Sequence, residues 1–239
     1  MTIKPILFNT EMVRAILDGR KSCTRRLPRK QIEEKYLEYD EWVQAVAVPG
    51  CTYLREKEFY TQYPPYKPGD VLYVRETWRV GAWDILNQMI AFDYKDGTCG
   101  ELTYIHDQEL FERLVNQSRN DARQAKGEYN GVDFVWEKGK SPCRWHPSIH
   151  MPKEAARIWL KVTDVRVERL KEITIDGIRN EGLSSMAVYA GDMEIAMEEW
   201  KNLWNSTIKK SDINHYGWDA NPWVWVIEFE QCEKPKEEN

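Results

Sequence analysis

The sequence predicts an α+β protein built on a small, mostly antiparallel β-barrel that is flanked by helices. Candidate elements follow one another as helix, strands, hairpin, strand, helices and strand, without a visible internal repeat. Hydrophobic residues make up 42% and charged residues 31% of the 239 residues, as in ordinary globular proteins. Regular βαβ alternation and a G-x-G-x-x-G motif are both missing, which argues against a Rossmann fold.

The first half of the chain supplies one helix and the opening strands. Apolar spacing predicts a helix over residues 9–17, and Gly19 is placed to end it in a left-handed conformation. The turn signal PGD at residues 68–70 precedes residues 71–78, which alternate well enough to form a strand. Residues 89–105 predict a hairpin with its Asp-Gly turn in the middle.

The second half of the chain supplies further helices and two long strands. We expect Thr174 and Asp192 to cap two helices, because each precedes a run with helical apolar spacing. Met193, Met197, Trp200 and Trp204 recur at that spacing and are expected in the core. The elements expected after residue 106 are a helix over 107–117, a polar loop over 118–131, a strand over 157–170, a helix over 174–182, a helix from 192 onward, and a strand over 221–231.

Composition argues against several classes of protein. No apolar run approaches the ~20 residues that would span a bilayer, so we expect no membrane partner. The five cysteines are widely spaced and form no C-x-x-C motif, which suits a reducing cytoplasm. A net charge of −5 disfavours indiscriminate coating of DNA, because phosphate affinity needs many cations that face one way. A local basic patch still fits a small or single-stranded nucleic acid.

Two short motifs resemble known binding sites but lack residues or local structure that those sites need. Residues 139–141 (GKS) resemble the end of a phosphate-binding loop, but Phe134 stands where that loop needs glycine. Cys143, His146 and His150 form C-x2-H-x3-H, yet nearby prolines argue against one shared helix and no fourth ligand is near in sequence. We therefore expect no metal and no cofactor.

One segment contrasts with the acidic chain as a whole. Residues 16–30 (ILDGRKSCTRRLPRK) are dense in cations and follow the first expected helix directly. Most charge runs are solvated surface, and the alternative is a cleft for an anionic ligand. The cations of the segment are Arg20, Lys21, Arg25, Arg26, Arg29 and Lys30.

This segment and three later blocks resemble a known family. Gly19, Lys21 and Arg26 make a G-x-K-x-x-x-x-R pattern, and KPGDVLYVRETW, IWLKVTDVRVERLKEITIDGIRNEGL and NPWVWVIEFE follow in order. Together these blocks resemble the ASCH domain family, relatives of the PUA-like RNA-binding folds. The chain as a whole is similar to longer ASCH proteins carried by phages and prophages.

The resemblance covers roughly residues 3–30, 66–80 and 155–230. It implies a single ASCH-like domain over residues 1–239, with a small PUA-like barrel and a cleft beside the first helix. Compact members do not match residues 81–147, so we expect a hairpin-and-loop insertion of unexplained role there.

The family resemblance implies binding of RNA or of a modified or unmodified nucleoside or nucleotide in the basic cleft. One compact bacterial branch is an amidohydrolase that removes acetyl from the exocyclic amine of acetylcytidine. Its lysine, threonine and glutamate fall on Lys21, Thr24 and Glu181, the last by a looser match. Glu76 in the strand over 71–78 is a rival carboxylate. The chain is far longer than that branch and Arg25 adds a charge, so the substrate stays open.

Hydrolysis of an amide needs an activated nucleophile, a proton acceptor and a group that stabilises the oxyanion. Lys21 is a candidate base, because the flanking arginines disfavour its charged form and should lower its pKa. Thr24 would be the nucleophile, and Glu181 or Glu76 would orient the lysine or protonate the leaving amine. In a regular strand Lys21 and Thr24 point to opposite faces, so we predict irregular backbone over residues 19–24. Alternatively, Thr24 bonds a nearby turn and Glu181 is an exposed helix residue.

The remaining candidates would bind the ligand, with cations on phosphates and aromatic rings stacked on bases. For each ring, a position in the core is the alternative. Three hypotheses stay open: an enzyme acting on a modified nucleoside, a non-catalytic RNA-binding module, and a phage accessory or assembly protein with a vestigial cleft. The sequence does not indicate the oligomeric state. The binding candidates are Arg20, Arg25, Arg26, Arg75, Tyr73, Trp78 and Trp145.

Overall fold

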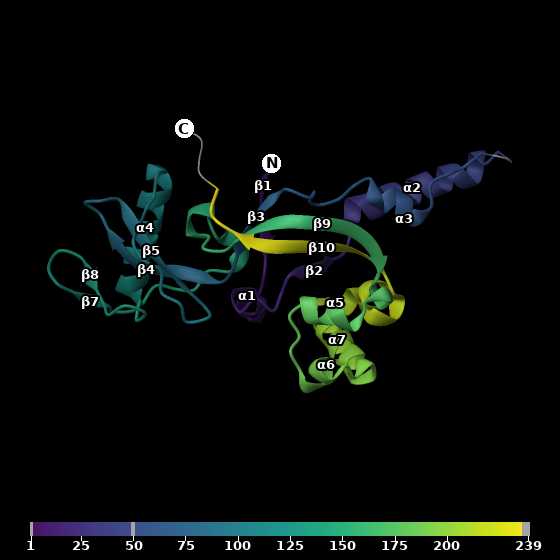
Figure 1. Ribbon diagram of the computed structural model, residues 1–239. Coiled ribbons are helices and arrows are strands. Elements are labelled where there is room, and N and C mark those ends of the chain that lie inside the picture. The colour runs from purple at the N-terminus through teal and green to yellow at the C-terminus, as the bar shows by residue number, and fades with distance from the viewer. Residues whose placement is uncertain (1, 49–50, 236–239) are drawn as a thin grey trace. The chain divides into compact units, whose positions relative to one another are not determined.

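The computed structural model describes residues 2–48 and 51–235 (Figure 1). Helices and strands are mixed along the chain, which confirms the α+β prediction. The chain divides into two compact units. Unit 1 contains the residues up to Ile3 with Ala15–Val71 and Leu160–Cys232, and unit 2 contains Lys4–Arg14, Leu72–Trp159 and the tail from Glu233. A single domain over 1–239 with an insertion at 81–147 stays a prediction.

The strands form three sheets. The five-stranded sheet has the order β1 (Ile3–Leu7), β3 (Val71–Arg75), β9 (Trp159–Arg169), β10 (Trp223–Cys232), β2 (Cys23–Arg26). The smaller sheets contain β4 (Trp78–Asp84), β5 (Met89–Tyr94) and β6 (Thr103–Tyr104), and β7 (Glu128–Tyr129) with β8 (Phe134–Val135). The pairs β2–β10, β4–β5, β5–β6 and β7–β8 are antiparallel, as predicted. Among the described strands no sheet closes into a barrel, so the predicted barrel was wrong: β1 and β2 end the order on opposite edges.

In unit 1, three helices cluster at one end of β9 and β10 (Figure 1): α5 (Ile175–Asn180), α6 (Met186–Ala190) and α7 (Met193–Thr207). The side chain of Thr174 accepts the amide of Gly177 and that of Asp192 accepts the amide of Ile195, so both predicted caps are confirmed. Trp200 and Trp204 are buried against the first residues of β10 and Met197 packs partly buried against them, as expected of the core. The prediction was wrong for Met193, which is 44% exposed because it is the first residue of α7.

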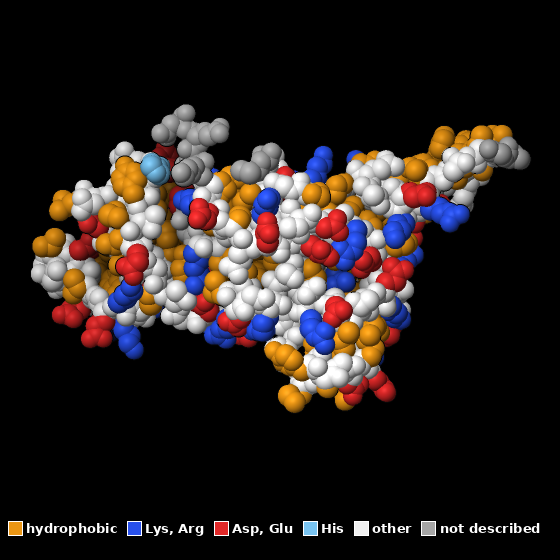
Figure 2. Space-filling model, viewed as in Figure 1, with side chains coloured by type: hydrophobic (Ala, Val, Ile, Leu, Met, Phe, Trp, Pro, Cys, Tyr) orange, Lys and Arg blue, Asp and Glu red, His pale blue; other side chains and the backbone are white. Residues whose placement is uncertain are grey.

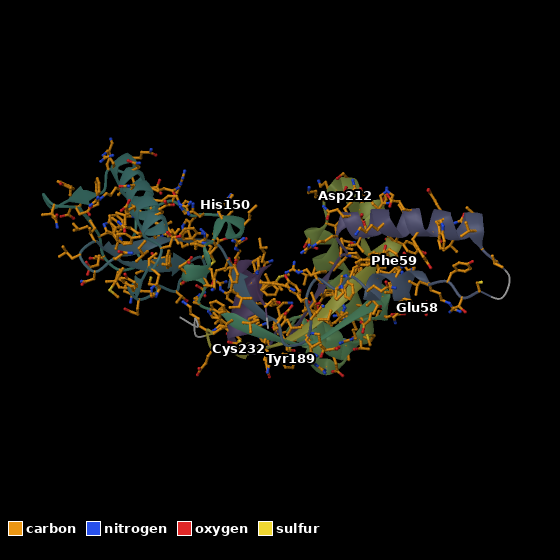
Figure 3. All side chains as sticks on the ribbon, turned by 90° about the horizontal axis from the view of Figure 1, so that it is seen from above. Glu58, Phe59, His150, Tyr189, Asp212 and Cys232 are labelled. Atoms are coloured by element: carbon orange, nitrogen blue, oxygen red, sulfur yellow. The ribbon has the colours of Figure 1, made fainter. Side chains whose placement is uncertain are left out.

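Unit 1 also contains a helical hairpin that was not predicted. Its helices are α2 (Lys30–Val46) and α3 (Glu56–Thr61). The ring of Phe59 lies 5.3 Å from that of Tyr39 and 5.4 Å from that of Tyr36, so aromatic contacts join the two helices (Figure 3). The unit further contains α8 (Ile213–Tyr216) and short 3₁₀ turns at Leu170–Glu172, Lys210–Asp212 and Trp218–Ala220.

Unit 2 pairs β4 with β5 and packs them with α4 (Gln108–Gln124). The strand expected over 71–78 ends at Arg75, and β4 begins three residues later as the hairpin partner of β5. The helix expected over 107–117 continues to Gln124, because Ser118 and Ala122 remain on its buried face. Two 3₁₀ turns lie at Ser148–His150 and Lys153–Ala155. Within residues 2–48 and 51–235, no helix is both long enough and apolar enough to cross a bilayer.

Candidate functional site

The basic segment begins where α1 (Thr10–Leu17) ends. Gly19 has φ +73°, and the amides of Arg20 and Lys21 both donate to the carbonyl of Ala15, at 2.8 and 2.9 Å. This turn directs Lys21 into an antiparallel bridge with Glu181, and β2 starts at Cys23. The backbone is therefore irregular up to residue 22, and only the last two residues of the predicted irregular stretch lie in a strand.

A close approach of two chain segments brings Lys21 to the end of α5. Glu181 is the residue after this helix, and Gly182 follows with φ +96°. A Cβ atom at Gly182 would lie 2.8 Å from Cβ of Ala15 and 3.1 Å from Cβ of Lys21, so only glycine fits without displacing its neighbours. The glycine thus permits the contact on which the candidate site depends.

Lys21 and Glu181 form a buried ion pair. The Nζ atom of Lys21 donates to Oε2 of Glu181 at 2.7 Å and to the carbonyl of the same residue at 3.0 Å. The two side chains are 0% and 3% exposed. Of the two carboxylates that the sequence proposed, Glu181 is the one that contacts Lys21.

Arg25 shares the carboxylate of Glu181. Its Nη1 atom lies 3.3 Å from Oε1 of Glu181, and its Nη2 atom lies 3.4 Å from Oε2 of Glu168. Nη1 also donates to the sulfur of Cys23 at 3.8 Å. The side chain of Arg25 is 3% exposed, and its role in binding a ligand stays a prediction.

The electrostatics around this cluster keep the neighbouring thiol protonated. Burial raises the pKa of Cys23 to about 12, and the carboxylate of Glu181 adds to the effect. A thiolate nucleophile at Cys23 is therefore disfavoured at neutral pH. Burial also lowers the pKa of Arg26, next along β2 after Arg25.

Thr24 lies within β2 opposite Ile227 of β10 and is buried. Successive side chains of a strand point to opposite faces, so Thr24 points away from the face that carries Cys23 and Arg25. The threonine is thus near the cluster in sequence but on the other side of the strand.

Glu76 belongs to a separate cluster in unit 2. Its two carboxylate oxygens accept from Arg157 at 2.9 Å each, and Arg157 also donates to Asp96 at 2.7 Å. Burial raises the pKa of Glu76, although Arg157 opposes the shift. The role proposed for Glu76 as an alternative to Glu181 stays a prediction without a contact to support it.

The predicted stacking residues have different surroundings in unit 2. Trp78 is buried and stacks on His146 with ring centroids 4.8 Å apart. Trp145 is half-buried, with the Arg79 guanidinium 4.6 Å and the Lys95 ammonium 4.7 Å from its ring centroid.

Tyr73 and Arg75 lie together on β3. The guanidinium of Arg75 is 5.6 Å from the ring centroid of Tyr73, and it donates to the carbonyl of Ile149 at 3.2 Å. Cys143 donates to the carbonyl of Ser118 at 3.7 Å. Over residues 2–48 and 51–235, no three His, Cys, Asp or Glu side chains are placed to hold a metal ion.

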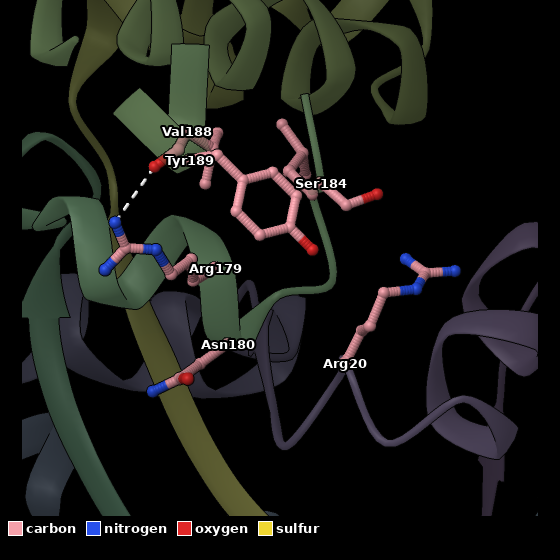
Figure 4. Close-up of a pocket in the computed structure, with 7 residues that line it drawn as sticks. Arg20, Arg179, Asn180, Ser184, Val188 and Tyr189 are labelled. Atoms are coloured by element: carbon pink, nitrogen blue, oxygen red, sulfur yellow. Dashed lines mark hydrogen bonds between the residues drawn. The ribbon is translucent and has the colours of Figure 1, made fainter. Parts of the chain in front are cut away.

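A pocket of about 210 Å³ lies in unit 1 beside the Lys21–Glu181 pair. Arg20 and Asn180, the residues that precede Lys21 and Glu181 in the chain, both line it. Figure 4 shows the Tyr189 ring between Arg20 on one side and Arg179 on the other. The other lining residues are Leu183, Ser184 and Val188.

Two guanidinium groups are held at the pocket. Arg20 donates to Asp18 and, at 2.8 Å, to the carbonyl of Gly182, while Arg179 donates to Asp176 and to the carbonyl of Val188. Their side chains are 35% and 43% exposed. A guanidinium has five N–H donors, so these contacts leave donors for an anion.

Sequence reasoning included Arg20 and missed Arg179, Asn180 and Tyr189. Arg179 and Asn180 stand directly before Glu181 in the RNEGL block, and their position there was the available signal. Tyr189, which is 69% exposed, lies in a short helix that was not predicted.

Comparisons with known proteins give little support for assigning this chain to a family. A scan against protein-family models found no match, and a search of the curated proteins found none either. Among solved structures, the chain is similar to a crystal structure of an ASCH domain from Lactobacillus crispatus JV V101, with 9% sequence identity and a TM-score of 0.32. The match covers 96% of this chain and 79% of that chain. A likeness at this level carries no argument about function, so membership of the ASCH family stays a prediction from the sequence.

Proposed function

We propose that the protein binds RNA or a nucleoside or nucleotide in the pocket of unit 1. Such a ligand needs cations for phosphate, a flat ring for the base and polar groups for the base edge. Arg20 and Arg179 supply the cations, Tyr189 the ring and Asn180 the amide. The observation that carries the proposal is the exposed Tyr189 ring between two arginines (Figure 4).

The size of the pocket favours a single nucleoside unit inside it. Pockets for drug-sized ligands typically have volumes of about 300–1,000 Å³. At about 210 Å³ the pocket of unit 1 is smaller than that range, so we expect one base with its ribose to enter. In an RNA ligand the neighbouring nucleotides would lie outside on the open side.

The test is a calorimetric titration with cytidine, cytidine monophosphate, N4-acetylcytidine and a short single-stranded RNA at several salt concentrations. Because stacking on an aromatic ring contributes about 1–3 kcal/mol, Tyr189→Ala should weaken binding about tenfold, whereas Tyr189→Phe should retain it. Arg179→Ala should reduce the salt dependence of RNA binding. Tyr129→Ala is the matched control, because Tyr129 is an exposed tyrosine of unit 2.

The proposal fails if none of these ligands binds at low salt. It also fails if Tyr189→Ala and Tyr129→Ala have the same small effect. Thermal unfolding of each variant distinguishes lost binding from lost folding.

The buried contact of Lys21 with Glu181 favours a second candidate, hydrolysis of an N-acyl group from a cytidine-like base. Lys21 would act as base and Thr24 as nucleophile, as the family resemblance implies. The side chains of the ion pair are covered, so this reaction requires the wall formed by Arg20 and Asn180 to open. Because Thr24 points to the other face of β2, we rank hydrolysis after binding.

Incubation with N-acylated cytidines tests this candidate by the release of free amine. Lys21→Ala should abolish turnover, and Thr24→Val should do the same if the hydroxyl is the nucleophile. Hydrolysis is excluded if the wild type shows no turnover or if Lys21→Ala is as active. Binding without turnover would leave the non-catalytic module, and loss of both would leave a phage accessory or assembly role. The phage-type relationship and the cytoplasmic location stay predictions.

A further inference from the structure

A row of charged side chains on β9 leads to the buried ion pair. Asp164, Arg166 and Glu168 alternate with Val165 and Val167, so the three charged residues share one face of the strand. Figure 2 shows acidic and basic side chains interspersed over the region of β9 and β10. We call Asp164, Arg166 and Glu168 the β9 row.

Contacts of alternating charge connect the β9 row to Arg25. The Oε1 atom of Glu168 accepts from Nε of Arg166 at 2.6 Å, and its Oε2 atom lies 3.4 Å from Nη2 of Arg25. Arg166 is in turn held by Asp164 at 2.9 Å and by Glu228 of β10 at 2.5 Å. Each oxygen of Glu168 therefore serves a different arginine.

Glu181, which is more deeply buried than Glu168, also divides its two carboxylate oxygens between two cations. Glu181 gives one oxygen to Arg25 and the other to Lys21. Lys21, Glu181 and Arg25 are buried, Glu168 is 21% exposed, and Arg166 is half-exposed. The charges alternate from the surface to the buried ammonium, with no two like charges in direct succession.

We propose that Glu168 and Arg166 are positioning residues for the candidate site. Glu168 fixes the guanidinium of Arg25, and Arg25 fixes the carboxylate of Glu181 in contact with Lys21. Arg166 fixes Glu168, because Asp164 and Glu228 anchor Arg166 from the other side. The inference deepens the proposed function in that it assigns the groups that hold Lys21 and Glu181, whose chain neighbours Arg20 and Asn180 line the pocket. Only the use of that pocket for a ligand rests on the proposed function.

Glu168 is needed in this position because two cations are buried in the cluster. Lys21 and Arg25 are both removed from water, and both contact the carboxylate of Glu181. Glu168 supplies the second negative charge from the edge of the cluster. Without it, Arg25 competes with Lys21 for Glu181, and the buried contact between Lys21 and Glu181 should open more often.

The test is chemical labelling of lysines in the intact protein, with the rate at Lys21 read by mass spectrometry after acetylation. Labelling of a covered side chain follows the population of the open form. In Glu168→Gln the rate at Lys21 should rise about tenfold, which corresponds to 1.4 kcal/mol. Arg166→Gln should raise it less, and Glu168→Asp should restore most of the protection.

Glu230→Gln is the matched control. Glu230 lies on β10, is 60% exposed, and pairs with Lys161 at 3.8 Å. This variant should leave the rate at Lys21 unchanged, while labelling of exposed lysines should be equal in all variants. A spectroscopic readout accompanies the rates: the Nζ–H signals of Lys21 in ¹⁵N-lysine NMR spectra should broaden in Glu168→Gln and not in Glu230→Gln.

The inference is overturned if Glu168→Gln leaves both the labelling rate and the NMR signal of Lys21 as in the wild type. If Glu168→Gln does not fold, Arg166→Gln decides in its place, and an unchanged Lys21 then overturns the inference. Neither measurement uses a ligand. A response at Lys21 together with failed nucleotide titrations would refute only the proposed function.

Discussion

Each unit of the molecule contains a buried cluster of charges, and the two clusters have opposite compositions. In unit 1, the carboxylate of Glu181 is shared by two cations, Lys21 and Arg25. In unit 2, the guanidinium of Arg157 is shared by two carboxylates, Glu76 and Asp96. The first cluster therefore places two cations around one carboxylate, with Glu168 at its edge as a second carboxylate, whereas the second cluster places two carboxylates around one guanidinium.

The difference shows which cluster is suited to a ligand. The guanidinium of Arg157 lies 4.0 Å from the ring centroid of Tyr94, which covers it, and its hydrogen bonds go to both carboxylates. The cluster of unit 1 instead lies beside a pocket whose walls add Arg20 and Arg179. These two partly exposed guanidinium groups at the pocket favour an anionic ligand. The unit 2 cluster has the features of a structural site.

The largest expected effect comes from removal of the shared carboxylate in unit 1. Glu181→Gln leaves two buried cations without their common partner and should lower the free energy of unfolding by about 3–5 kcal/mol. Glu76→Gln should cost less, about 1.5–3 kcal/mol, because Asp96 still neutralises Arg157. Urea denaturation of both variants measures the difference. Equal losses would mean that the two clusters do not differ as described.

The second largest effect is expected at Gly182, where the chain after α5 comes close to Ala15 and Lys21. Gly182→Ala should destabilise the protein by about 2–4 kcal/mol, because the left-handed φ is strained and the new Cβ overlaps Ala15. Gly191→Ala is the control: its φ is also positive, but open space surrounds it, so about 1 kcal/mol is expected. Thermal unfolding of both compares them. A loss at Gly182 no larger than at Gly191 would show that the close contact with Lys21 is not needed.

The smallest effect is a pH dependence in unit 2. Burial raises the pKa of Glu76 in the folded protein above its usual 4.5, so the folded state holds this proton more tightly than the unfolded state. The contribution of Glu76 to stability is therefore complete below pH 4.5 and declines as the pH rises through the folded pKa. Relative to Glu76→Gln, the wild type should lose unfolding free energy as the pH rises above 4.5. A gain over that range would reverse the assigned direction.

Local signals in the sequence predicted much of unit 1. Thr174 and Asp192 were identifiable as caps because each stands before an apolar run of helical period. The open sheet was not predictable, because alternation identifies strands but does not say whether the first and last strands pair. The helix α2 was missed although Tyr36 and Tyr39 lie on its contact face with α3, because its many charges resemble a loop.

The sequence predicted only part of the candidate site, because local patterns do not show which distant residues come into contact. The spacing of Gly19 and Lys21 located the segment, yet composition cannot tell a buried cation from a solvated one. Arg25 contacts Glu181 and Glu168, residues more than 140 positions away in the chain, and neither contact was predicted. Such long-range partners are set by packing and not by local pattern. For the same reason Tyr189 went unnoticed.

The helix α2 has a consequence for how the molecule opens. All 17 of its residues fall in the described range 2–48, and none of them is buried. A helix with no buried residue of its own loses few contacts when it separates, so its amides should exchange with deuterium sooner than those of β9 and β10. Proteases should then make their first cut in or next to this helix, while the site at the end of α5 stays intact.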